Sequence, residues 1–404
     1  MEILRNRKVV LGITGSIAAY KAVEILRKLQ KAGAEVKVAM TPSASKFIST
    51  LTLQTISGYP VYLEAVPENS PEIRHTSLSS WGELFIVAPA TANTISKIAH
   101  GIADTSVTNL ALCFGKGIIC PAMNVRMYEN PVTQKNLEIL KNLGYEIVEP
   151  DSGYLACREK GKGRLAEVED ILDAAFYWFI PKLLKGKRVV VTAGATREYI
   201  DPVRFLSNPS SGKMGFELAK AARGAGAEVT LITGKTQLRT PYDIKRIDVE
   251  TVEEMKEAVL EATKDVDIYI SAAAIGDYRP IKREEKKIKK SERKLILELE
   301  RTPDILKLIG EGKRNGQIVI GFAAETDNLV ENARKKIEEK NLDAIVANDV
   351  KKGIFGSDKT EISFITKKGE FLISGSKEEV SIKIVQLIYE NFFKGVEQRN
   401  VWLF

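Results

Sequence analysis

Two side chains in the first half of the chain could carry proton transfer or thiol chemistry. His75, in the segment EIRHTS, is one of two histidines, the other being His100. Histidine changes protonation state near neutral pH and can act as a general base, although in a polar turn it is more often a solvated surface residue. Cys157 lies in the glycine-punctuated segment SGYLACREKGKGRLAE, where Arg158 and Lys160 favour the thiolate. These two residues are our candidates for proton transfer.

The other two cysteines indicate packing rather than chemistry. Cys113 and Cys120 stand among apolar residues, as buried structural thiols do. Three cysteines cannot build a disulfide framework, and their spacing matches no zinc-binding pattern. The reactive thiol is therefore expected at Cys157.

The second half contains a dense run of charge, KREEKKIKKSERK, from Lys282 to Lys294. It holds eight basic and three acidic residues, so its net charge of +5 leaves only +2 of the total +7 for the rest of the chain. One local basic loop suits a small phosphorylated ligand better than a nucleic acid, which requires a broader basic surface. We expect no nucleic-acid partner. A solvated charged loop is the plainer interpretation of this run.

Two segments open in the same way, with basic residues, an apolar run and a glycine turn. The first is RKVVLGITGSIAAY from Arg7, and the second is KRVVVTAGATREY from Lys187. Both reach nearly the same helix exit and strand, AGAEVKVAMT from Ala32 and AGAEVTLITG from Ala225. A strand that leads through a glycine turn into a helix is typical of nucleotide-binding α/β folds. The repetition predicts two doubly wound, Rossmann-like α/β domains.

Length and composition agree with this division. A chain of 404 residues with 44% apolar content can build two cores. The segment FYWFIPKLLKGK, residues 176–187, predicts the connection, because its aromatic residues can cover the first domain and its Pro, Gly and Lys residues form a short linker. The expected domains are residues 1–184 and 185–404.

Apolar runs in the first domain predict strands of one parallel sheet, each followed by small or polar residues. These strands are Val9–Ile13, Val36–Met40, Leu84–Ala88 and Ile118–Cys120. The segments that follow them are GSI, TPS, PATANT and PAMN. Ligands of doubly wound folds bind at the carboxyl ends of the strands, so these segments predict a binding site.

The same pattern leaves other nucleotide-binding functions open. A flavin or nicotinamide oxidoreductase and a non-catalytic nucleotide-binding module would both show strands and glycine turns. The dinucleotide fingerprint GxGxxG is missing, and Thr41 and Thr233 end the second strands where an acidic residue would bind the ribose. This favours a mononucleotide over NAD(P). The reactive setting of Cys157 argues against a purely binding module.

The motifs of the two halves resemble two enzyme families. GSIAAYK, PATANT, His75, PAMN and the Cys157 segment, in this order, resemble the flavin-dependent cysteine decarboxylases, specifically phosphopantothenoylcysteine decarboxylase. LSNPSSGKMG, AAAIGDYRP, KIKK and GFAAET are similar to phosphopantothenate–cysteine ligase. Together they resemble the bifunctional enzymes of coenzyme A biosynthesis over essentially the whole chain. The resemblance implies a flavodoxin-like flavoprotein domain followed by a Rossmann-like ligase domain.

This resemblance implies two consecutive reactions. The ligase joins cysteine to 4'-phosphopantothenate through an acyl-cytidylate formed from CTP, with Mg²⁺. The decarboxylase then converts phosphopantothenoylcysteine to 4'-phosphopantetheine with FMN. An amide-linked cysteine has no electron sink for its carboxylate, and oxidation of the thiol by the flavin creates one.

In the first half, the resemblance assigns His75 as the base of the oxidative step and Cys157 as the proton donor of the final reduction. Asn124, with Met123, is implied to bind the substrate carboxylate. The implied FMN-binding residues are Gly15, Ser16, Thr41, Ser43, Thr91 and Asn93. Thr91 stands where the family usually has Ser, which retains the hydroxyl.

In the second half, the resemblance selects Lys287 to stabilise charge at the α-phosphate, although the residues alone do not separate it from Lys286, Lys289 or Lys290. Asn208 is implied to handle the acyl-cytidylate, while Ser210 and Ser211 beside it also fit a plain helix cap. The implied nucleotide-binding residues are Ser271, Ala272, Ala273, Asp277, Lys287, Pro303, Asp304, Ile305, Leu306, Phe322, Lys336 and Lys340. Asp277 is also the candidate ligand for Mg²⁺, and Lys336 and Lys340 could instead be the polar face of a helix.

Assembly and location follow from the resemblance and from the first residues. Flavin domains of this family form trimers and the ligase domains pair, so we expect a homo-oligomer, a dodecamer built from trimers and dimers. The segment MEILRN leads into the first strand without an apolar signal region, and no run approaches the length of a membrane span. We expect a cytoplasmic protein without a membrane partner.

Overall fold

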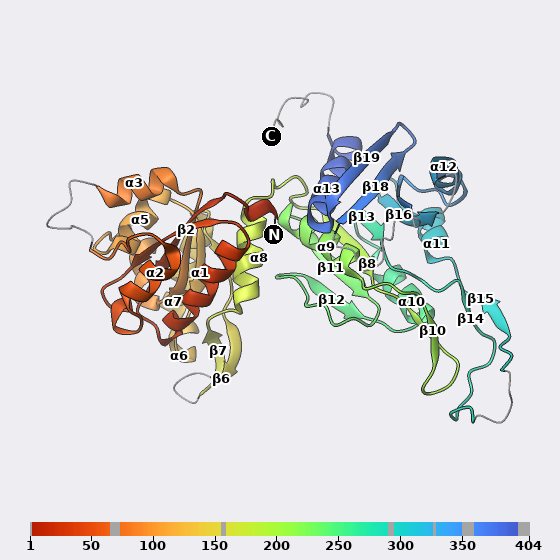
Figure 1. Cartoon of the computed structure of the whole chain (residues 1–404), viewed down its shortest axis with the longest axis horizontal. Coiled ribbons are helices and arrows are strands. Elements are labelled where there is room, and N and C mark those ends of the chain that lie inside the picture. Colours follow the sequence, from red (N-terminus) through yellow and green to blue (C-terminus); the bar gives the residue numbers. More distant parts are fainter. Residues whose placement is uncertain are drawn as a thin grey trace. The chain divides into compact units, whose positions relative to one another are not determined.

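The chain forms two compact units, Met1–Phe179 and Ile180–Phe404 (Figure 1). The computed structural model describes residues 2–64, 73–154, 159–289, 295–325, 329–349 and 359–394. Within these, the side chains of residues 324, 325, 349 and 359 are not described. The division between the two units lies near the expected domain boundary at residues 184/185.

The N-terminal unit is built on a parallel sheet. In its described part, five strands are hydrogen-bonded in the order β2-β1-β3-β4-β5, and every pairing is parallel. Their bounds are β1 Lys8–Ile13, β2 Glu35–Met40, β3 Leu84–Ala90, β4 Ile118–Pro121 and β5 Glu146–Ile147. This is the flavodoxin-like order, which confirms the predicted fold class. The four predicted strands are all present within a residue or two of their expected bounds.

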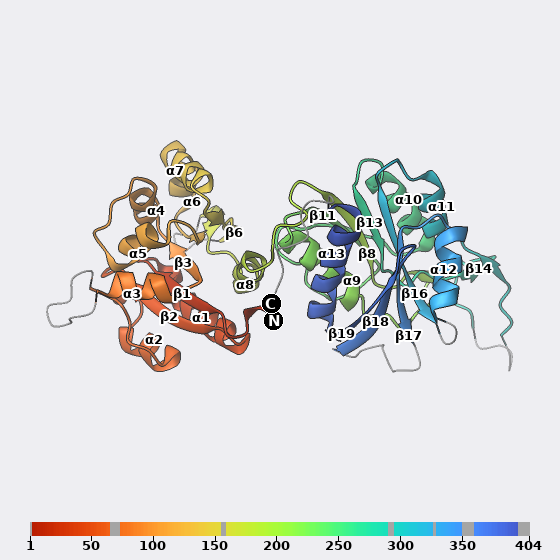
Figure 2. The ribbon, with the colours of Figure 1, turned by 90° about the horizontal axis from the view of Figure 1, so that it is seen from above.

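Helices cover both faces of this sheet, which explains why its strands are almost wholly buried (Figure 2). Phe85 and Val87 of β3 belong to a core with Ile95 of α4, Leu110 of α5 and Leu137 of α7. On the other face, α1 packs against α8. The helices are α1 Ala22–Lys31, α2 Thr50–Ser57, α3 Arg74–Trp81, α4 Ala92–Ala99, α5 Ser106–Phe114, α6 Val125–Tyr128, α7 Pro131–Asn142 and α8 Val168–Trp178. Short 3-10 helices are η1 Glu2–Leu4, η2 Ile17–Lys21 and η3 Ala44–Lys46, and β6 Asp151–Tyr154 pairs with β7 Lys160–Arg164.

The C-terminal unit contains a larger, mixed sheet. Its described strands form an eight-stranded sheet in the order β12-β11-β8-β13-β16-β17-β18-β19. The strands are β8 Arg188–Ala193, β11 Glu228–Thr233, β12 Lys245–Asp248, β13 Ile268–Ser271, β16 Ile318–Glu325, β17 Ala344–Asp349, β18 Lys359–Thr366 and β19 Glu370–Ser376. The pairings from β12 to β17 are parallel, and those of β18 with its two neighbours are antiparallel. Because the strand direction reverses at β18 and again at β19, β19 runs parallel to the strands from β12 to β17.

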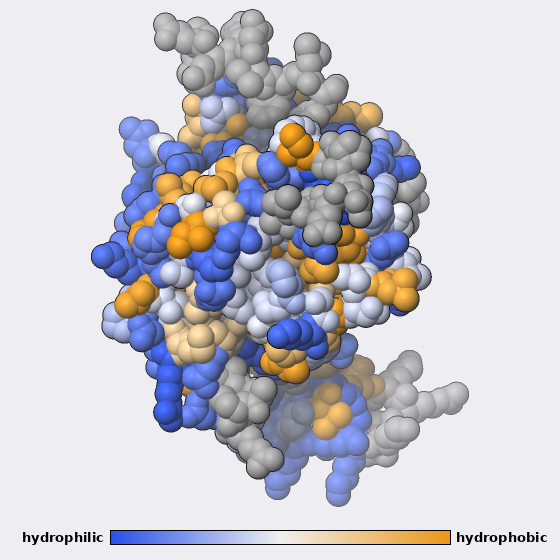
Figure 3. Space-filling model, turned by 90° about the vertical axis from the view of Figure 1, so that its left-hand side faces the viewer, coloured by the Kyte–Doolittle hydropathy of each residue, from blue (hydrophilic) through white to orange (hydrophobic). Residues whose placement is uncertain are grey.

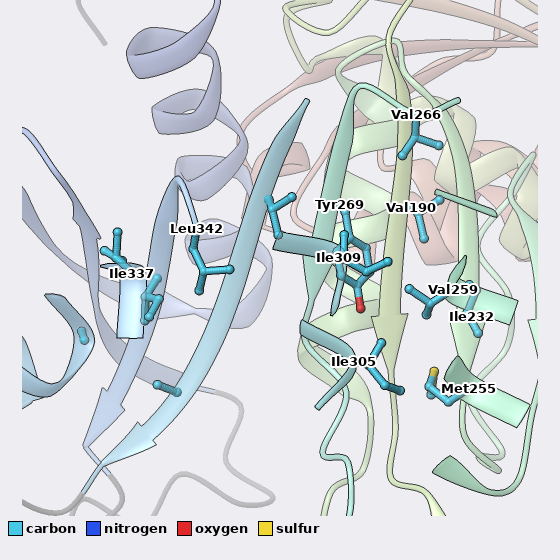
Figure 4. Packing of buried hydrophobic residues seen from close by; sticks show 14 of the residues in the cluster. Val190, Ile232, Met255, Val259, Val266, Tyr269, Ile305, Ile309, Ile337 and Leu342 are labelled. Atoms are coloured by element: carbon cyan, nitrogen blue, oxygen red, sulfur yellow. The ribbon is translucent and has the colours of Figure 1, made fainter. Parts of the chain in front are cut away.

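Two layers of helices enclose this sheet as well. One core joins Val190 and Tyr269 of the sheet to Met255 of α10, Ile305 of α11 and Ile337 of α12, and the labelled side chains point into a common interior (Figure 4). On the other face, α9 packs against α13. The bounds are α9 Lys213–Gly224, α10 Val252–Ala262, α11 Ile305–Gly312, α12 Leu329–Glu339 and α13 Lys377–Phe392. Two short pairs stand outside the main sheet, β9 Arg197–Tyr199 with β10 Phe205–Ser207, and β14 Tyr278–Pro280 with β15 Leu299–Arg301.

Among the residues that the structure describes, no helix is long and apolar enough to cross a membrane. On the face seen in Figure 3, hydrophobic residues form separate patches between hydrophilic ones. Exposed apolar side chains on the N-terminal unit include Leu51, Ile102 and Leu112. Scattered exposure of this kind is normal for folded domains.

Candidate functional site

The N-terminal unit contains a cavity of about 670 Å³ at the carboxyl ends of β1, β3 and β4. This volume is in the range of sites that enclose a cofactor-sized ligand. Seven residues that the sequence assigned to the flavin or its substrate line it: Gly15, Ser16, Ser43, Thr91, Asn93, Met123 and Asn124. The folding of four separate loops onto one sheet edge therefore brings these residues together.

The loop after β1 comes so close to Ser43 that only glycine fits at position 15. A Cβ atom on Gly15 would lie 2.6 Å from the Ser43 Oγ and 2.7 Å from its Cβ. Ser43 is itself held at 3.1 Å from the hydroxyl of Thr41, and Ser16 accepts a hydrogen bond from the Ala18 N–H at 3.3 Å. Thr41 is buried and is not among the described lining residues, so it contacts the cavity through Ser43.

The PATANT segment presents its polar groups through a local hydrogen-bond chain. The Thr14 hydroxyl donates to the Pro89 carbonyl at 2.8 Å and accepts from the Thr91 N–H at 3.0 Å. The Thr91 side chain then caps α4, accepting from the Thr94 N–H at 3.4 Å. These bonds fix the Thr91 hydroxyl and the exposed Asn93 at the cavity wall.

The PAMN segment is clamped against the β6–β7 pair. The Met123 N–H donates to the Gly163 carbonyl at 2.9 Å, and a Cβ on Gly163 would lie 2.3 Å from the Met123 carbonyl oxygen. The Asn124 side-chain amide donates to Glu159 at 2.9 Å, and Arg126 pairs with the same carboxylate at 2.7 Å. Glu159 thus accepts the hydrogen bond that the Asn124 amide would donate to a substrate carboxylate.

The two predicted catalytic residues of the N-terminal unit, His75 and Cys157, are not among the described residues that line the cavity. His75 lies in the first turn of α3, half-buried, rather than in the expected turn, and it is not among the described lining residues. Cys157 lies outside the described residues. The strands on either side of its segment do reach the cavity, through Tyr154, Gly163 and Arg164.

Sequence reasoning missed two cations at this cavity. Lys21 and Arg164 both line it. The Lys21 ammonium lies 3.6 Å from the Glu167 carboxylate, and the Arg164 guanidinium donates a hydrogen bond to the same carboxylate. Lys21 closes the GSIAAYK motif and Arg164 follows the KGKG run, so both stood in segments already singled out. Basic side chains beside a glycine loop and several hydroxyls fit the phosphate of a mononucleotide such as FMN.

The C-terminal unit has two adjoining cavities, of about 450 and 470 Å³, at the carboxyl ends of β13 and β16. They share Ala273, Ile275, Asp277, Phe322 and Lys340. The first, which we call the nucleotide cavity, is also lined by Ser271, Pro303, Asp304, Ile305 and Leu306. The second, which we call the phosphate cavity, is also lined by Asn208, Ala272 and Lys336. The predicted nucleotide-binding residues therefore meet at one sheet edge, with the exception of Lys287.

Asp304 and Lys340 join the start of α11 to the end of α12. The Asp304 carboxylate caps α11 by accepting from the Lys307 N–H at 3.0 Å, and its second oxygen lies 2.8 Å from the Lys340 Nζ. Partial burial opposes ionisation of Asp304, but the hydrogen bonds from Lys340 and from the Lys307 N–H outweigh it and lower its pKa. The ion pair holds the Lys340 side chain where it lines both cavities.

Asn208 bridges two loops instead of capping a helix. Its side-chain amide donates to the carbonyls of Ala274 and Ile275 at 3.4 and 3.2 Å. The residue that caps α9 is Gly212, at a φ of +80°, while Ser210 and Ser211 accept from the next N–H groups at 3.3 and 3.4 Å. The helix cap of this turn is therefore Gly212, and Asn208, which is predicted to bind the acyl-cytidylate, is a different residue.

Lys287 lies on the exposed loop after β14 and is not among the described residues that line either cavity. Its neighbour Ile288 is held on both sides, because its N–H donates to the Asp201 carboxylate at 3.2 Å and its carbonyl accepts from Arg204 at 3.3 Å. Asp201 is fully buried, which opposes its ionisation, yet three backbone N–H donors outweigh this and lower its pKa. Lys286 and Lys289 are exposed as well, and Lys290 lies outside the described residues.

Asp277, the candidate metal ligand, is exposed where the two cavities meet, and its carbonyl accepts from the Thr302 N–H at 3.0 Å. Within the described ranges, no group of three or more His, Cys, Asp or Glu side chains could hold a metal ion.

Family models match both halves of the chain. The model described as flavoprotein matches residues 2–179, and the model of the DNA/pantothenate metabolism flavoprotein C-terminal domain matches residues 184–392. The coenzyme A biosynthesis bifunctional protein CoaBC of Bacillus subtilis is 47% identical, with 95% of this chain and 97% of that protein covered. The chain belongs to this CoaBC family.

Further relatives give the same result for the CoaBC family. The Haemophilus influenzae member is 42% identical, over 97% of this chain and 99% of that protein. A solved C-terminal domain of a CoaBC protein is 42% identical, covers 52% of this chain and 97% of that domain, and has a TM-score of 0.44. The expected class of enzyme, a bifunctional flavoprotein of coenzyme A biosynthesis with decarboxylase and ligase parts, is thereby confirmed.

Proposed function

We propose that residues 1–184 bind FMN in the first cavity and decarboxylate phosphopantothenoylcysteine to 4'-phosphopantetheine. The observation that carries this is the convergence of Gly15, Ser43, Thr91 and Asn124 on one cavity of cofactor size. The missing side chain at Gly15, the hydroxyls and the basic Lys21 and Arg164 fit a flavin mononucleotide. FMN, when bound, accepts electrons from the substrate thiol and so creates the electron sink that lets carbon dioxide leave.

The chain's own residues then bind substrate and move protons. Asn124 binds the substrate carboxylate, which replaces Glu159 as the acceptor of its side-chain amide. Thr41 contributes by holding Ser43 against the cofactor rather than by direct contact. His75 removes the substrate proton in the oxidative step. After carbon dioxide has left, Cys157 donates a proton to the enethiolate, and the two electrons taken up in the oxidative step would return to it, so that the overall reaction is redox-neutral.

For residues 185–404 we propose the ligase step, which supplies the decarboxylase with its substrate. CTP occupies the nucleotide cavity, Lys336 and Lys340 bind its phosphates, and the carboxylate of 4'-phosphopantothenate attacks the α-phosphate. Pyrophosphate leaves with the electron pair of the broken P–O bond, and the amine of cysteine then displaces the cytidylate. Lys287 stabilises the charge that develops at the α-phosphate, and Asn208 binds the acyl-cytidylate.

Mg²⁺ enters this proposal through the triphosphate. Magnesium commonly binds one or two carboxylates together with substrate phosphates, and Asp277 offers a carboxylate where the two cavities meet. The chain's own contribution to the metal site is therefore small without the nucleotide.

Assembly and location complete the proposal: a cytoplasmic homo-oligomer, a dodecamer built from trimers and dimers. Apolar side chains at the rim of the first cavity support the association of this unit. Ile17, Tyr20 and Tyr154 line that cavity and are 60%, 64% and 78% exposed. Such a rim is covered when a second copy completes the site.

A mass spectrum of the products tests both reactions together. Purified protein is incubated with 4'-phosphopantothenate, cysteine, CTP and Mg²⁺, and its flavin content is read from its absorption spectrum. Formation of 4'-phosphopantetheine supports both activities. Accumulation of phosphopantothenoylcysteine by flavin-loaded protein would contradict the decarboxylase assignments, and absence of pyrophosphate would contradict the ligase. Tight NADPH binding by flavin-free protein would favour the nicotinamide oxidoreductase instead.

A further inference from the structure

The phosphate cavity extends beyond the residues used so far. Its far end is lined by Lys213 of α9, Asn348 of β17, Thr360 of β18 and Lys377 of α13. We call these four residues the distal subsite. None of them has a role in the ligase step as proposed above, and Asn348, Thr360 and Lys377 stood in no sequence motif of the second half.

The topology of the sheet explains how these residues meet. Because β19 runs parallel to β17, its carboxyl end lies at the ligand edge, and α13 begins there with Lys377. The antiparallel β18 starts at the same edge, where Thr360 pairs with Gly375, two residues before Lys377. Asn348 is the next-to-last residue of β17 and lies at this edge as well.

Burial makes the distal subsite unusual. Lys377 is only 6% exposed although it lines a cavity. The Asn348 Oδ1 and the Thr360 Oγ1 are buried and have no hydrogen-bond partner among the described residues. Buried polar atoms are normally paired, so two unpaired ones in one cavity wall indicate a ligand that completes them.

The charge of the phosphate cavity indicates the sign of that ligand. Its described lining residues include four lysines and a single carboxylate, Asp277. Lys340 is paired with Asp304 outside this lining, and the other three are Lys213, Lys336 and Lys377. The amino ends of α9 and α13 add partial positive charge, and the two helices are packed together. A phosphoryl group supplies up to two negative charges and several acceptor oxygens, which match the lysine ammonium groups and the Thr360 hydroxyl. Asn348 can donate to such an oxygen when its amide turns to present Nδ2 in place of Oδ1.

We propose that the distal subsite of Lys213, Asn348, Thr360 and Lys377 binds a phosphoryl group during the ligase reaction. Two reactants carry one, the phosphate monoester of 4'-phosphopantothenate and the terminal phosphates of CTP. Either of these phosphoryl groups would be held away from the α-phosphate of CTP. The carboxylate of 4'-phosphopantothenate would then remain free to react. This inference rests on the ligase function proposed above.

The test replaces Lys377 by Gln in the full-length protein. Pyrophosphate release is measured while 4'-phosphopantothenate, unphosphorylated pantothenate and CTP are varied in turn. Lys377→Gln is expected to raise one KM by about 10- to 100-fold, as loss of a hydrogen bond to a charged group does. If the subsite holds the substrate phosphate, the preference for 4'-phosphopantothenate over pantothenate falls by this factor. If it holds CTP phosphates, the KM for CTP rises and that preference is kept.

Unchanged values of both KM and of the substrate preference in Lys377→Gln would overturn the proposal. Lys383→Gln is the matched control, because Lys383 is exposed on the same helix and should behave as the wild type. Thr360→Val provides a second variant that removes a donor and keeps the side-chain shape. Thermal unfolding of each variant, compared with that of the wild type, reports whether the altered C-terminal unit is intact. A wild-type protein without pyrophosphate release would instead refute the ligase proposal, and the subsite with it.

Discussion

The first cavity and the phosphate cavity occupy equivalent places in their units but have different walls. Both lie at the carboxyl ends of parallel strands, behind a glycine turn that follows the first strand. The first is lined by hydroxyls, amides and apolar side chains with the two cations Lys21 and Arg164. The second presents Lys213, Lys336 and Lys377 among its described residues. Under the proposed function, the same architecture would serve a flat aromatic cofactor in one unit and polyphosphate in the other, and the side chains of its loops would decide which.

The two units also differ in what separates the first strand from its helix. In the N-terminal unit, β1 ends at Ile13 and η2 begins at Ile17. In the C-terminal unit, residues 194–212 stand between β8 and α9, and they contain the β9–β10 pair. This insertion carries Asn208 and holds the loop of Lys287. The residues proposed for the ligase step thus lie on, or are held by, a segment without an equivalent between β1 and η2 of the N-terminal unit, so variants should affect the two reactions separately.

The largest separation is expected from Cys157→Ser. Loss of a general acid costs about 10²- to 10⁴-fold, so carbon dioxide release should continue while the saturated product is lost. Ligation should keep its wild-type rate because it uses the other unit. Carbon dioxide and the thiol product are measured separately, with Cys113→Ser as the control. Formation of the saturated product at the wild-type rate would remove Cys157 from the mechanism.

Lys287→Gln is the reciprocal variant. Pyrophosphate release should slow by about 10²- to 10³-fold, as loss of transition-state charge stabilisation does, and decarboxylation should be unchanged. Lys282→Gln is the matched control, because Lys282 is exposed on the same loop and pairs with Glu284 at 3.0 Å. A stronger effect of Lys286→Gln or Lys289→Gln would transfer the role to that lysine.

A smaller effect is expected from Gly15→Ala. The new Cβ would lie 2.6 Å from the Ser43 Oγ, so the loop or Ser43 must shift. Overpacking of this kind costs about 1–3 kcal/mol, and flavin content should fall by about tenfold or more. Gly153→Ala is the control, since its nearest neighbouring atom would be 3.8 Å away. Full flavin occupancy in Gly15→Ala, read from the absorption spectrum, would show that this close approach is unimportant.

The smallest effect concerns the Asp304–Lys340 pair. Because the folded state lowers the Asp304 pKa, its stabilising contribution is present above the ordinary carboxyl pKa and fades as the pH falls through the folded value. Asp304→Ala should lower the local stability of α11 by about 1 kcal/mol near pH 7, mostly through the lost cap, and Asp304→Asn should lower it less. Hydrogen exchange of the α11 amides measures both. Equal losses in the two variants would mean that the ion pair, not the cap, matters.

The sequence predicted the sheet of the N-terminal unit well because buried parallel strands are continuous apolar runs. It predicted much of the first cavity because the GSI, TPS, PATANT and PAMN segments directly follow such strands. The lining residues Tyr154, Gly163 and Arg164 come instead from the β6–β7 pair. His75 was expected in a turn, yet α3 begins at Arg74 without a side-chain cap, so the usual start signal was missing. Asn348, Thr360 and Lys377 could not be assigned because pairing of distant strands brings them to the cavity. The β9–β10 pair was missed because its strands are only three residues long.

The buried carboxylate of Asp201 joins two segments that are far apart in the sequence. It accepts from the N–H groups of Val203 and Arg204 on the insertion and from Ile288 on the Lys287 loop. A loop tethered in this way has fewer independent conformations to lose than a loop without such a tether. Bringing Lys287 to a bound nucleotide therefore costs less conformational entropy than ordering a free loop of the same length.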